Sequence, residues 1–466
     1  MGIVSDVRSV LPSTNRNFES RIANLDNRVG EVLESNTLLR NDLASNSNNL
    51  GDRFEISLRR VEDRLSAWET ERAKPSYCNV EYLSLNQAYR GRRILLAGWY
   101  GASNCGDELM MRSVMQHFDN SDVRVSVLLW DDPDYDFSRL PKKADQIHYP
   151  HSLWELRQLS EYFDVLVWGG GAIIDEHQFS HDPKNCNTGN LLIWLSEEML
   201  KRDKAVYAIG LSANDTLGTD TEYSRRLNNI VCNACHVSLR DVYSRNVLSS
   251  AGVDVSRVEL CEDVVFGNRH ICVHDAREAN GGLFTVGVVF MMGDLTREHN
   301  KRMLPHLIER LQEQYGEGYR LLLIPFYNYW KFDVSLLAEL CDELKVPEQV
   351  EIARYSDELE SLALLDCDAV VAYRYHACLA AAAAHIPTLF MCVDGHPHYR
   401  NKMQHIAELF GMEKGLLMSS TCLDDGSFDQ GFSSLLAGSM IPQIPDGLFE
   451  KTARFLDRIC NAIVSE

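Results

Sequence analysis

The sequence contains no long apolar run, no surplus of basic residues and no regular framework of cysteines. Because no segment approaches the roughly 18 uninterrupted apolar residues of a membrane-spanning helix, we expect no transmembrane segment. The 46 Lys and Arg residues are outnumbered by 67 Asp and Glu residues, and the net charge is −21. This balance argues against a nucleic acid as partner, since phosphate backbones bind to basic surfaces. It is compatible with a small anionic ligand, which a few local cations suffice to hold.

The 13 cysteines are irregularly spaced, and several lie within apolar segments. The single C-x-x-C, from Cys232 to Cys235, has no second pair at zinc spacing, so we expect no metal site. An odd number of scattered cysteines is typical of reduced, buried thiols, and we therefore expect a cytoplasmic protein. The first residues also lack a basic stretch followed by an apolar one, so we expect no secretory signal.

Residues 1–76 differ in pattern from the rest of the chain. From Phe18 to Trp68 apolar residues follow alternating steps of three and four, with Asn36 and Asn46 at seam positions and one shift of register. This heptad pattern predicts a coiled coil that makes the protein a homo-oligomer. A helical hairpin folded onto the rest of the chain is the alternative. The narrow apolar stripe with polar flanks favours self-association.

From residue 92 onward, apolar strands alternate with amphipathic helices, which is typical of parallel βαβ units. The strands expected for a first sheet are 92–98, 123–130, 163–171, 205–211, 234–241 and 259–266, and those for a second sheet are 284–290, 319–326, 350–355, 367–374 and 386–392. Residues 270–283 are the expected linker. We therefore predict an α/β fold with two Rossmann-like, doubly wound domains, residues 77–275 and 276–466. In such folds the ligand binds at the carboxyl ends of the strands.

Glycines follow two of the expected strands. Gly106 lies in a turn that leads into a helix near Asp107, where free amides and the helix dipole favour an anion. Gly169, Gly170 and Gly171 follow a buried strand directly, at a cost in backbone entropy. We expect such glycines where a ligand lies against the main chain. For the first turn, a plain tight turn capped by the aspartate is an equally good interpretation.

Charged residues stand where other strands end. Arg240 ends one strand of the first sheet, and Asp263 lies in an apolar run, where a buried carboxylate needs a partner. Arg374 and His376 follow a strand of the second sheet, and the alternation of an extended chain predicts both on one side. The guanidinium group of arginine is well suited to carboxylates and phosphates. Together with Lys402 downstream, these residues predict a local cationic pocket, although each arginine taken alone fits a structural ion pair.

Taken in order, these motifs resemble the polysaccharide pyruvyl transferase family. The resemblance covers roughly residues 90–412 and rests on Asn-x-Gly-Asp-Glu at 104–108, the glycine triplet, Ser-x-Arg-Asp at 238–241, Asp263, and Arg-x-His at 374–376 with Lys402 downstream. Three departures are Tyr373, where the family has a serine, His385-Ile386 in place of the glycine before Pro387, and an unusual stretch at residues 395–401 before Lys402.

The resemblance implies a two-domain arrangement of the GT-B kind and transfer of the enolpyruvyl group of phosphoenolpyruvate to two hydroxyls of a sugar. The products are a cyclic pyruvate ketal and phosphate, and no metal or cofactor is implied. The acceptor would be a glycan or a lipid-linked sugar, and a lipid-linked acceptor would bring the protein to the membrane surface. The residues implied are His376, Asp107 and Asp263 as catalytic groups, with His376 as general acid, and Asn104, Gly106, Gly169, Gly170, Gly171, Arg240, Arg374 and Lys402 as substrate-binding groups.

Two other interpretations fit the same sequence. A nucleotide-sugar glycosyltransferase of the GT-B kind would need a carboxylate to hold the ribose. Asp394 is a candidate for that role, but the pair of glutamates expected nearby is missing. A non-catalytic scaffold would combine the coiled coil with a degenerate transferase body used for binding, and the departures near residues 385–400 are compatible with it.

Overall fold

The computed structural model describes residues 91–118, 123–130, 135, 140–141, 144–150, 153–179, 188–213, 217–268, 282–294, 296–395 and 397–465. The chain divides into two compact units, Met1–Tyr77 and Cys78–Glu466. The coiled coil predicted for residues 1–76 lies outside the described residues, as does most of the predicted linker.

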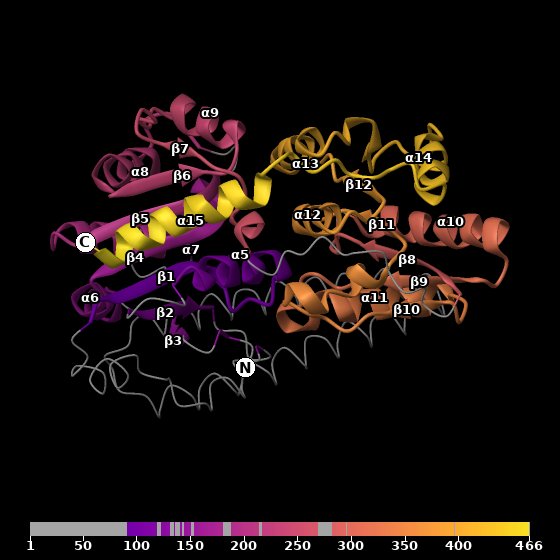
Figure 1. Ribbon diagram of the computed structural model, residues 1–466, viewed down its shortest axis with the longest axis horizontal. Coiled ribbons are helices and arrows are strands. Elements are labelled where there is room, and N and C mark those ends of the chain that lie inside the picture. Colours follow the sequence, from indigo (N-terminus) through magenta and orange to yellow (C-terminus); the bar gives the residue numbers. More distant parts are fainter. Residues whose placement is uncertain are drawn as a thin grey trace, which may run out of the picture. The chain divides into compact units, whose positions relative to one another are not determined.

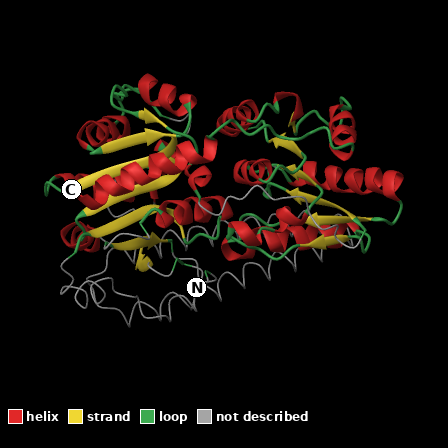
Figure 2. Ribbon diagram, viewed as in Figure 1, coloured by secondary structure: helices red, strands yellow, loops and turns green. Residues whose placement is uncertain are grey.

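Among the described residues, the first half of the second unit forms a seven-stranded parallel sheet flanked by helices (Figures 1 and 2). Its strands are β1 (Arg93–Tyr100), β2 (Arg124–Leu129), β3 (Ala144–His148), β4 (Val165–Ile174), β5 (Ala205–Ala213), β6 (His236–Leu239) and β7 (Glu259–Leu260). Its helices are α5 (Cys105–Gln116), α6 (Leu153–Tyr162), α7 (Thr188–Leu200), α8 (Glu222–Asn233) and α9 (Val242–Ser250), with 3-10 turns η2 (Glu176–Gln178) and η3 (Val264–Gly267). The order β3-β2-β1-β4-β5-β6-β7 winds outward in both directions from β1 and β4.

The second half repeats this plan with a six-stranded parallel sheet of order β10-β9-β8-β11-β12-β13. Its strands are β8 (Phe284–Val289), β9 (Tyr319–Leu323), β10 (Val350–Ile352), β11 (Ala369–Ala372), β12 (Thr388–Cys392) and β13 (Leu416–Met418). Its helices are α10 (Arg297–Tyr315), α11 (Phe332–Leu344), α12 (Tyr375–Ala383), α13 (Pro397–Leu409) and α14 (Ser427–Leu436), with 3-10 turns η4 (Tyr329–Lys331), η5 (Leu359–Ser361), η6 (Ala363–Asp366) and η7 (Glu413–Gly415). The final helix is α15 (Leu448–Ser465).

The prediction of two Rossmann-like, doubly wound halves is therefore confirmed. The sequence pattern does not predict β3, which mixes polar and apolar residues, or β13, which is only three residues long. It predicts one strand over residues 259–266, but only Glu259 and Leu260 pair as β7. Asp263 instead begins the turn η3, because its carboxylate accepts a hydrogen bond from the Val265 N–H at 3.0 Å.

Both sheets are apolar along most of their length because helices cover them, as is usual for parallel sheets. One hydrophobic cluster continues from the first half into the second: Leu109 and Met110 of α5 and the alanines of α12 belong to it. In α12 Ala377, Ala380 and Ala381 are at most 1% exposed. The small side chains allow α12 to pack closely beside α5, which places the two helix starts near each other.

The last helix, α15, packs against the first half (Figure 1), although residues 276–466 are predicted to form one domain. Its apolar face is buried, and a Cβ on Gly267 would lie 2.5 Å from Leu456 Cδ1. His117 Nδ1 lies 2.7 Å from an Asp457 carboxylate oxygen, and Arg458 pairs with Glu259 at 2.7 Å. The prediction is corrected in this respect: α15 returns to the first sheet because its apolar residues find their partners there.

Ten described cysteines are free thiols, six of them buried. Within the described residues, no helix has both the length and the apolar character needed to cross a bilayer.

We expect Leu456→Ala to lower the free energy of unfolding by about 2–5 kcal/mol, because it leaves a cavity where α15 meets η3. Urea denaturation followed by circular dichroism measures the change. Arg454→Ala, on the exposed face of the same helix, is the control and is expected to stay within about 0.5 kcal/mol of the parent. Equal losses for the two variants would contradict the assignment of α15 to the first half.

Candidate functional site

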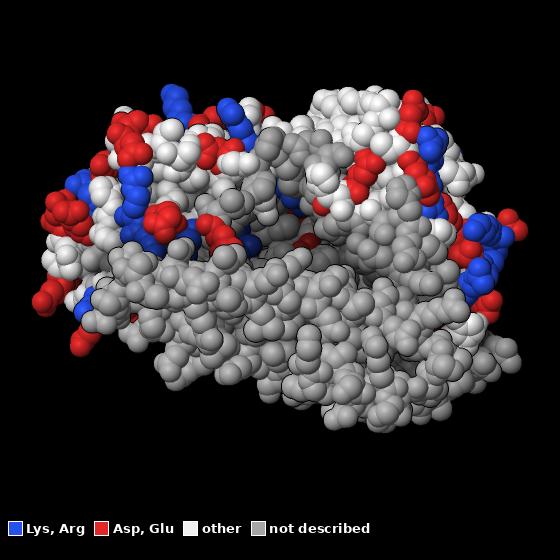
Figure 3. Space-filling model, turned by 180° about the vertical axis from the view of Figure 1, so that it is seen from behind, with Lys and Arg blue, Asp and Glu red and all other residues white. Residues whose placement is uncertain are grey.

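Five of the charged residues predicted from the sequence lie together where the carboxyl ends of the strands meet. They form the central cluster: Asp107, Arg240, Asp263, His376 and Lys402. Asp107 follows β1, Arg240 follows β6 and Asp263 follows β7, whereas His376 follows β11 and Lys402 lies on α13. Figure 3 shows a hollow near the middle of the face that it draws, and both acidic and basic atoms are visible inside it.

Asp263 is the centre of this arrangement. Its side chain is fully buried, and its Oδ2 accepts a hydrogen bond from Arg240 Nη1 at 2.7 Å. The same oxygen lies 3.5 Å from His376 Nε2, and the other accepts from the Val265 N–H. Burial by itself raises the pKa of Asp263, but His376, Arg240 and the amide together outweigh it, so the pKa is lowered and the group is a carboxylate.

His376 has a buried nitrogen without a full hydrogen bond. Its Nε2 is 3.5 Å from Asp263, which is too long for a well-formed hydrogen bond, and no other described residue bonds to it. Burial lowers the pKa of His376, although the charge of Asp263 acts in the opposite direction. An unsatisfied buried nitrogen costs stability, and a bound ligand would satisfy it.

Gly106 makes room for this imidazole. A Cβ at Gly106 would lie only 2.0 Å from His376 Nδ1, closer than any real contact. Gly106 is the second residue of α5 in the first half and His376 is the second residue of α12 in the second, so the glycine allows the two helix starts to meet. The sequence predicts that Gly106 exposes the backbone to a ligand; in the structure its free space holds a side chain of the protein.

The glycine triplet is explained in the same way. The Tyr100 hydroxyl donates to the Gly169 carbonyl, and a Cβ at Gly169 would lie 2.4 Å from that hydroxyl oxygen. Gly170 and Gly171 have φ of +89° and +100°, which other residues rarely adopt. A Cβ at Gly171 would lie 3.2 Å from Asp107 Oδ1. Neighbouring side chains thus fill the space where a Cβ would lie, and a ligand against the backbone of these glycines stays a prediction.

Asp107 and Lys402 form a pair of half-buried groups that titrate near neutrality. Burial raises the pKa of Asp107 to about 7, against the opposing charges of Lys402 and Arg240. Burial lowers the pKa of Lys402 to about 7, helped by Arg240 and opposed by Asp107. Asn104 donates a side-chain hydrogen bond to Asp107 and so fixes its position. Within the described residues, no group of three or more His, Cys, Asp or Glu side chains is placed to hold a metal ion.

Arg374 lies with different partners. Its Nη2 donates to both carboxylate oxygens of Asp333, at 3.0 and 3.2 Å. Asp333 also accepts from the Phe326 and Tyr327 N–H groups, so the pair braces the chain between β9 and α11. The expectation that Arg374 and His376 share one side is wrong, because α12 begins at Tyr375 and the chain is no longer extended there. A role for Arg374 in binding substrate stays a prediction.

Tyr373, the departure from the family serine, does not reach the central cluster. It is 1% exposed and packs near Phe290, and its hydroxyl lies 2.8 Å from His299 Nε2.

Three residues of the site are not predicted from the sequence: Asp333, Tyr375 and Glu108. The ring of Tyr375 lies under Arg240, with its centroid 4.6 Å from the guanidinium carbon. Glu108 is fully buried and accepts from the Gly101 N–H at 2.7 Å, and burial raises its pKa to about 8. The available signal for Glu108 was its place in the Asn-x-Gly-Asp-Glu motif at 104–108. The positions of Asp333 and Tyr375 carry no comparable signal.

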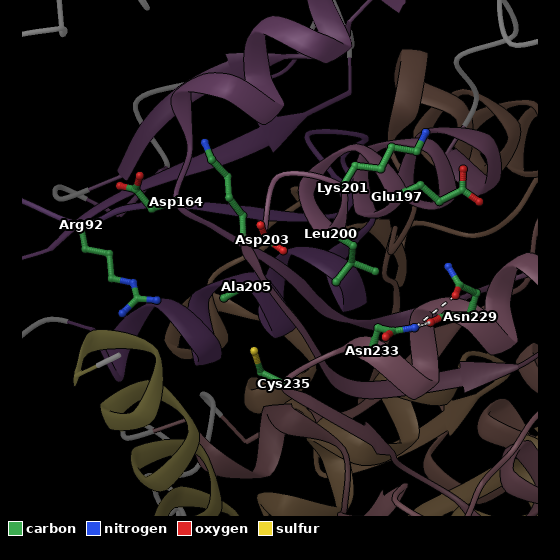
Figure 4. A pocket seen from close by; sticks show the side chains of 11 residues that line it. Arg92, Asp164, Glu197, Leu200, Lys201, Asp203, Ala205, Asn229, Asn233 and Cys235 are labelled. Atoms are coloured by element: carbon green, nitrogen blue, oxygen red, sulfur yellow. Dashed lines mark hydrogen bonds between the residues drawn. The ribbon is translucent and has the colours of Figure 1, made fainter.

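A second depression, of about 1030 Å³, lies at the opposite, amino-terminal edge of the first sheet (Figure 4). Side chains of both signs line it, including Arg92, Asp164, Glu197 and Lys201. None of the predicted site residues belongs to it. Because ligands of doubly wound folds bind at the carboxyl ends of the strands, we take the central cluster as the candidate site.

Comparison with known proteins concerns the family and the fold of the chain. The family profile of the polysaccharide pyruvyl transferases matches residues 104–394, a segment that contains four of the five cluster residues. No curated protein matches the chain. Among solved structures, UDP-GlcNAc 2-epimerase from Neisseria meningitidis bound to UDP-GlcNAc has a TM-score of 0.52 at 10% identity, over 79% of this chain and 100% of that one. The enzyme from Methanocaldococcus jannaschii has a TM-score of 0.50 at 11% identity, over 80% and 99%. At these identities the likeness shows a shared GT-B-like fold.

The contact between Gly106 and His376 predicts that substitutions at the two positions are not additive. With His376 present, Gly106→Ala is expected to cost about 1–3 kcal/mol of unfolding free energy, because the new methyl overlaps the imidazole. In a His376→Ala background the same change is expected to be neutral or stabilising, since alanine favours a helix more than glycine does. Urea denaturation of the parent, the two single variants and the double variant gives the coupling free energy between the two positions. Equal costs in both backgrounds would show that the two residues do not touch.

The lowered pKa of Lys402 predicts a pH-dependent stability. At pH values between the folded pKa of about 7 and the ordinary value of 10.5, Lys402 binds more protons in the unfolded chain than in the folded one. The contribution of Lys402 to the free energy of unfolding therefore rises with pH. The free energy of unfolding of the parent, relative to Lys402→Met, should therefore increase from pH 7 to more alkaline pH. Denaturation at several pH values measures it. Lys414→Met, at an exposed position, should give a flat difference, and a flat difference for Lys402→Met would contradict the burial of its charge.

Proposed function

Since the chain belongs to the polysaccharide pyruvyl transferase family, we propose that it transfers the pyruvyl group of phosphoenolpyruvate to two hydroxyls of a sugar, forming a cyclic ketal and releasing phosphate. The observation that carries the proposal is the central cluster. In a protein of net charge −21, two cations, Arg240 and Lys402, lie beside a buried imidazole nitrogen that lacks a hydrogen bond.

Phosphoenolpyruvate carries a carboxylate and a phosphate, so it needs at least two sources of positive charge. Arg240 uses one nitrogen on Asp263 and has further N–H donors for the substrate. Lys402 supplies a second cation, because an arriving anion raises its pKa. The same effect raises the pKa of His376, so the bound substrate favours the protonated imidazole that the reaction needs.

The reaction balances with the groups of the central cluster. His376 gives a proton to the methylene carbon of phosphoenolpyruvate, and the carbon that bears the phosphate becomes positively charged. A sugar hydroxyl adds to that carbon and loses its proton to a base. The C–O bond to phosphate then breaks, the second hydroxyl forms the ketal, and its proton leaves with the phosphate. One hydroxyl proton thus replaces the proton given to the methyl group, and the other leaves on phosphate.

The two aspartates divide the remaining roles. Asp107, whose pKa is raised to about 7, suits the part of the base that accepts a hydroxyl proton near neutral pH. Asp263 keeps a lowered pKa and is held by Arg240, so it orients the imidazole and balances its charge. We propose that Asn104 acts by positioning Asp107, and that Gly106 and the glycine triplet act by giving space to His376, Tyr100 and Asp107.

The nucleotide-sugar alternative has less support in the site. The fold is shared with a structure bound to UDP-GlcNAc, but that likeness concerns the fold alone. Asp394, the candidate for holding a ribose, already accepts hydrogen bonds from Ser419 and Ser420. We also propose that the enzyme acts in the cytoplasm, needs no cofactor, takes a glycan or lipid-linked acceptor, and assembles as a homo-oligomer through residues 1–76.

The proposal is tested by phosphate release from phosphoenolpyruvate, measured with and without a panel of glycan acceptors. We expect release only with a suitable acceptor, and a loss of at least about 100-fold in His376→Ala, the usual contribution of a general acid. The control is His385→Asn, at the exposed far end of α12, which should keep the parent rate. Thermal stabilisation by UDP-GlcNAc but not by phosphoenolpyruvate would show that the donor is a nucleotide sugar.

A further inference from the structure

Four half-buried aromatic residues lie near the central cluster and have no role in the chemistry above. They form the aromatic platform: Trp99, Trp130, Tyr327 and Tyr329. The rings of Trp99 and Trp130 are stacked with centroids 4.7 Å apart, and those of Tyr327 and Tyr329 are near-parallel at 6.3 Å. Trp130 Nε1 lies 3.4 Å from the Tyr329 hydroxyl, so the two pairs adjoin.

The platform lies at the carboxyl edge of both sheets. Trp99 is the second-last residue of β1 and Trp130 directly follows β2, whereas the tyrosines follow β9 in the second half. Tyr327 forms a β-bridge with Asn104, which lies two residues before Gly106 and its contact with His376. Tyr327 is therefore joined to Asn104, which bonds to Asp107, and residues of both halves contribute the rings.

A fifth aromatic residue shows which part of this group is structural. Tyr149 is 4% exposed; its ring meets Trp130 edge-on at 4.7 Å, and its hydroxyl donates to the Gly98 carbonyl at 2.9 Å. Tyr149 thus supports the platform from within the core. The four platform rings keep part of their surface exposed at the edge where substrates bind, which packing alone does not require.

The chemistry of such rings fits a neutral sugar. A pyranose has faces of C–H groups and a rim of hydroxyls, so it stacks on aromatic rings and bonds to polar tips such as the tyrosine hydroxyl and the indole N–H. The guanidinium of Arg374 lies 5.8 Å from the Tyr327 ring and is itself paired with Asp333. The cations that suit phosphate and carboxylate are in the central cluster instead.

We propose that the aromatic platform is the acceptor subsite, where a neutral hexopyranose ring stacks and presents its hydroxyls to the central cluster. The proposal rests on the proposed function for the identity of the sugar as acceptor. Sugar binding at the platform, however, requires neither phosphoenolpyruvate nor catalysis, and it can be measured by itself.

The test uses the full-length chain without phosphoenolpyruvate and a panel of neutral methyl hexopyranosides. Saturation-transfer NMR and tryptophan fluorescence titration measure binding. We expect Tyr329→Ala to weaken binding about three- to tenfold, the range of one stacked aromatic contact, and Tyr329→Phe to keep most of it. The matched control is Tyr315→Ala: Tyr315 stacks on Phe284 at 4.6 Å, also half-buried, but at the amino end of β8. It should bind the sugars as the parent does.

Three results would overturn the platform: no glycoside of the panel binds the parent, Tyr329→Ala binds as tightly as the parent, or Tyr315→Ala is weakened equally. Failure of the proposed function gives a different result. In that case the glycosides bind and depend on Tyr329, but phosphoenolpyruvate neither stabilises the protein nor releases phosphate.

Discussion

The arrangement of the site depends on one buried carboxylate, that of Asp263. It belongs to the first half, where it pairs with Arg240, and it is also the charged partner of His376 from the second half. A buried carboxylate without partners destabilises the fold. The contact of Asp263 with His376 forms only when both halves are in place. The same group therefore holds the arginine, fixes the histidine and links the two sheets. The ring of Tyr375 beneath Arg240 strengthens this link from the second half.

Small residues make that contact sterically feasible. The imidazole of His376 reaches Asp263 only because Gly106 has no side chain and the alanines of α12 let it lie close to α5. Gly171 leaves comparable space for Asp107. The glycine motifs near the strand ends thus shape the positions of His376 and Asp107 in the central cluster. Ligand contact with the backbone is a natural first interpretation of such motifs, but here the neighbouring side chains account for them.

The sequence predicts the two sheets and the members of the central cluster, because strands have a strong apolar signal and charged residues at strand ends are exceptional. It does not predict which cation pairs with which acid. The alternation of a strand groups Arg374 with His376, but α12 begins at Tyr375, between the two residues. Its partner Asp333 is 41 residues away in sequence, and no local pattern joins them. The return of α15 to the first half is equally non-local. The apolar face of an amphipathic helix predicts that the helix packs on another part of the protein, but it does not predict which part.

Charge and aromatic surface divide the site into two parts with different physical properties. The central cluster contains two cations, two carboxylates and an imidazole, and its protonation changes near pH 7 because Asp107 and Lys402 both titrate there. Binding at the cluster is therefore linked to protons and to ionic strength. We expect binding at the proposed platform to depend on contact between apolar surfaces, which neither pH nor salt changes strongly. Since Asn104 contacts Tyr327 on one side and Asp107 on the other, it joins the two parts, and its place in the structure explains why an uncharged residue belongs to the site.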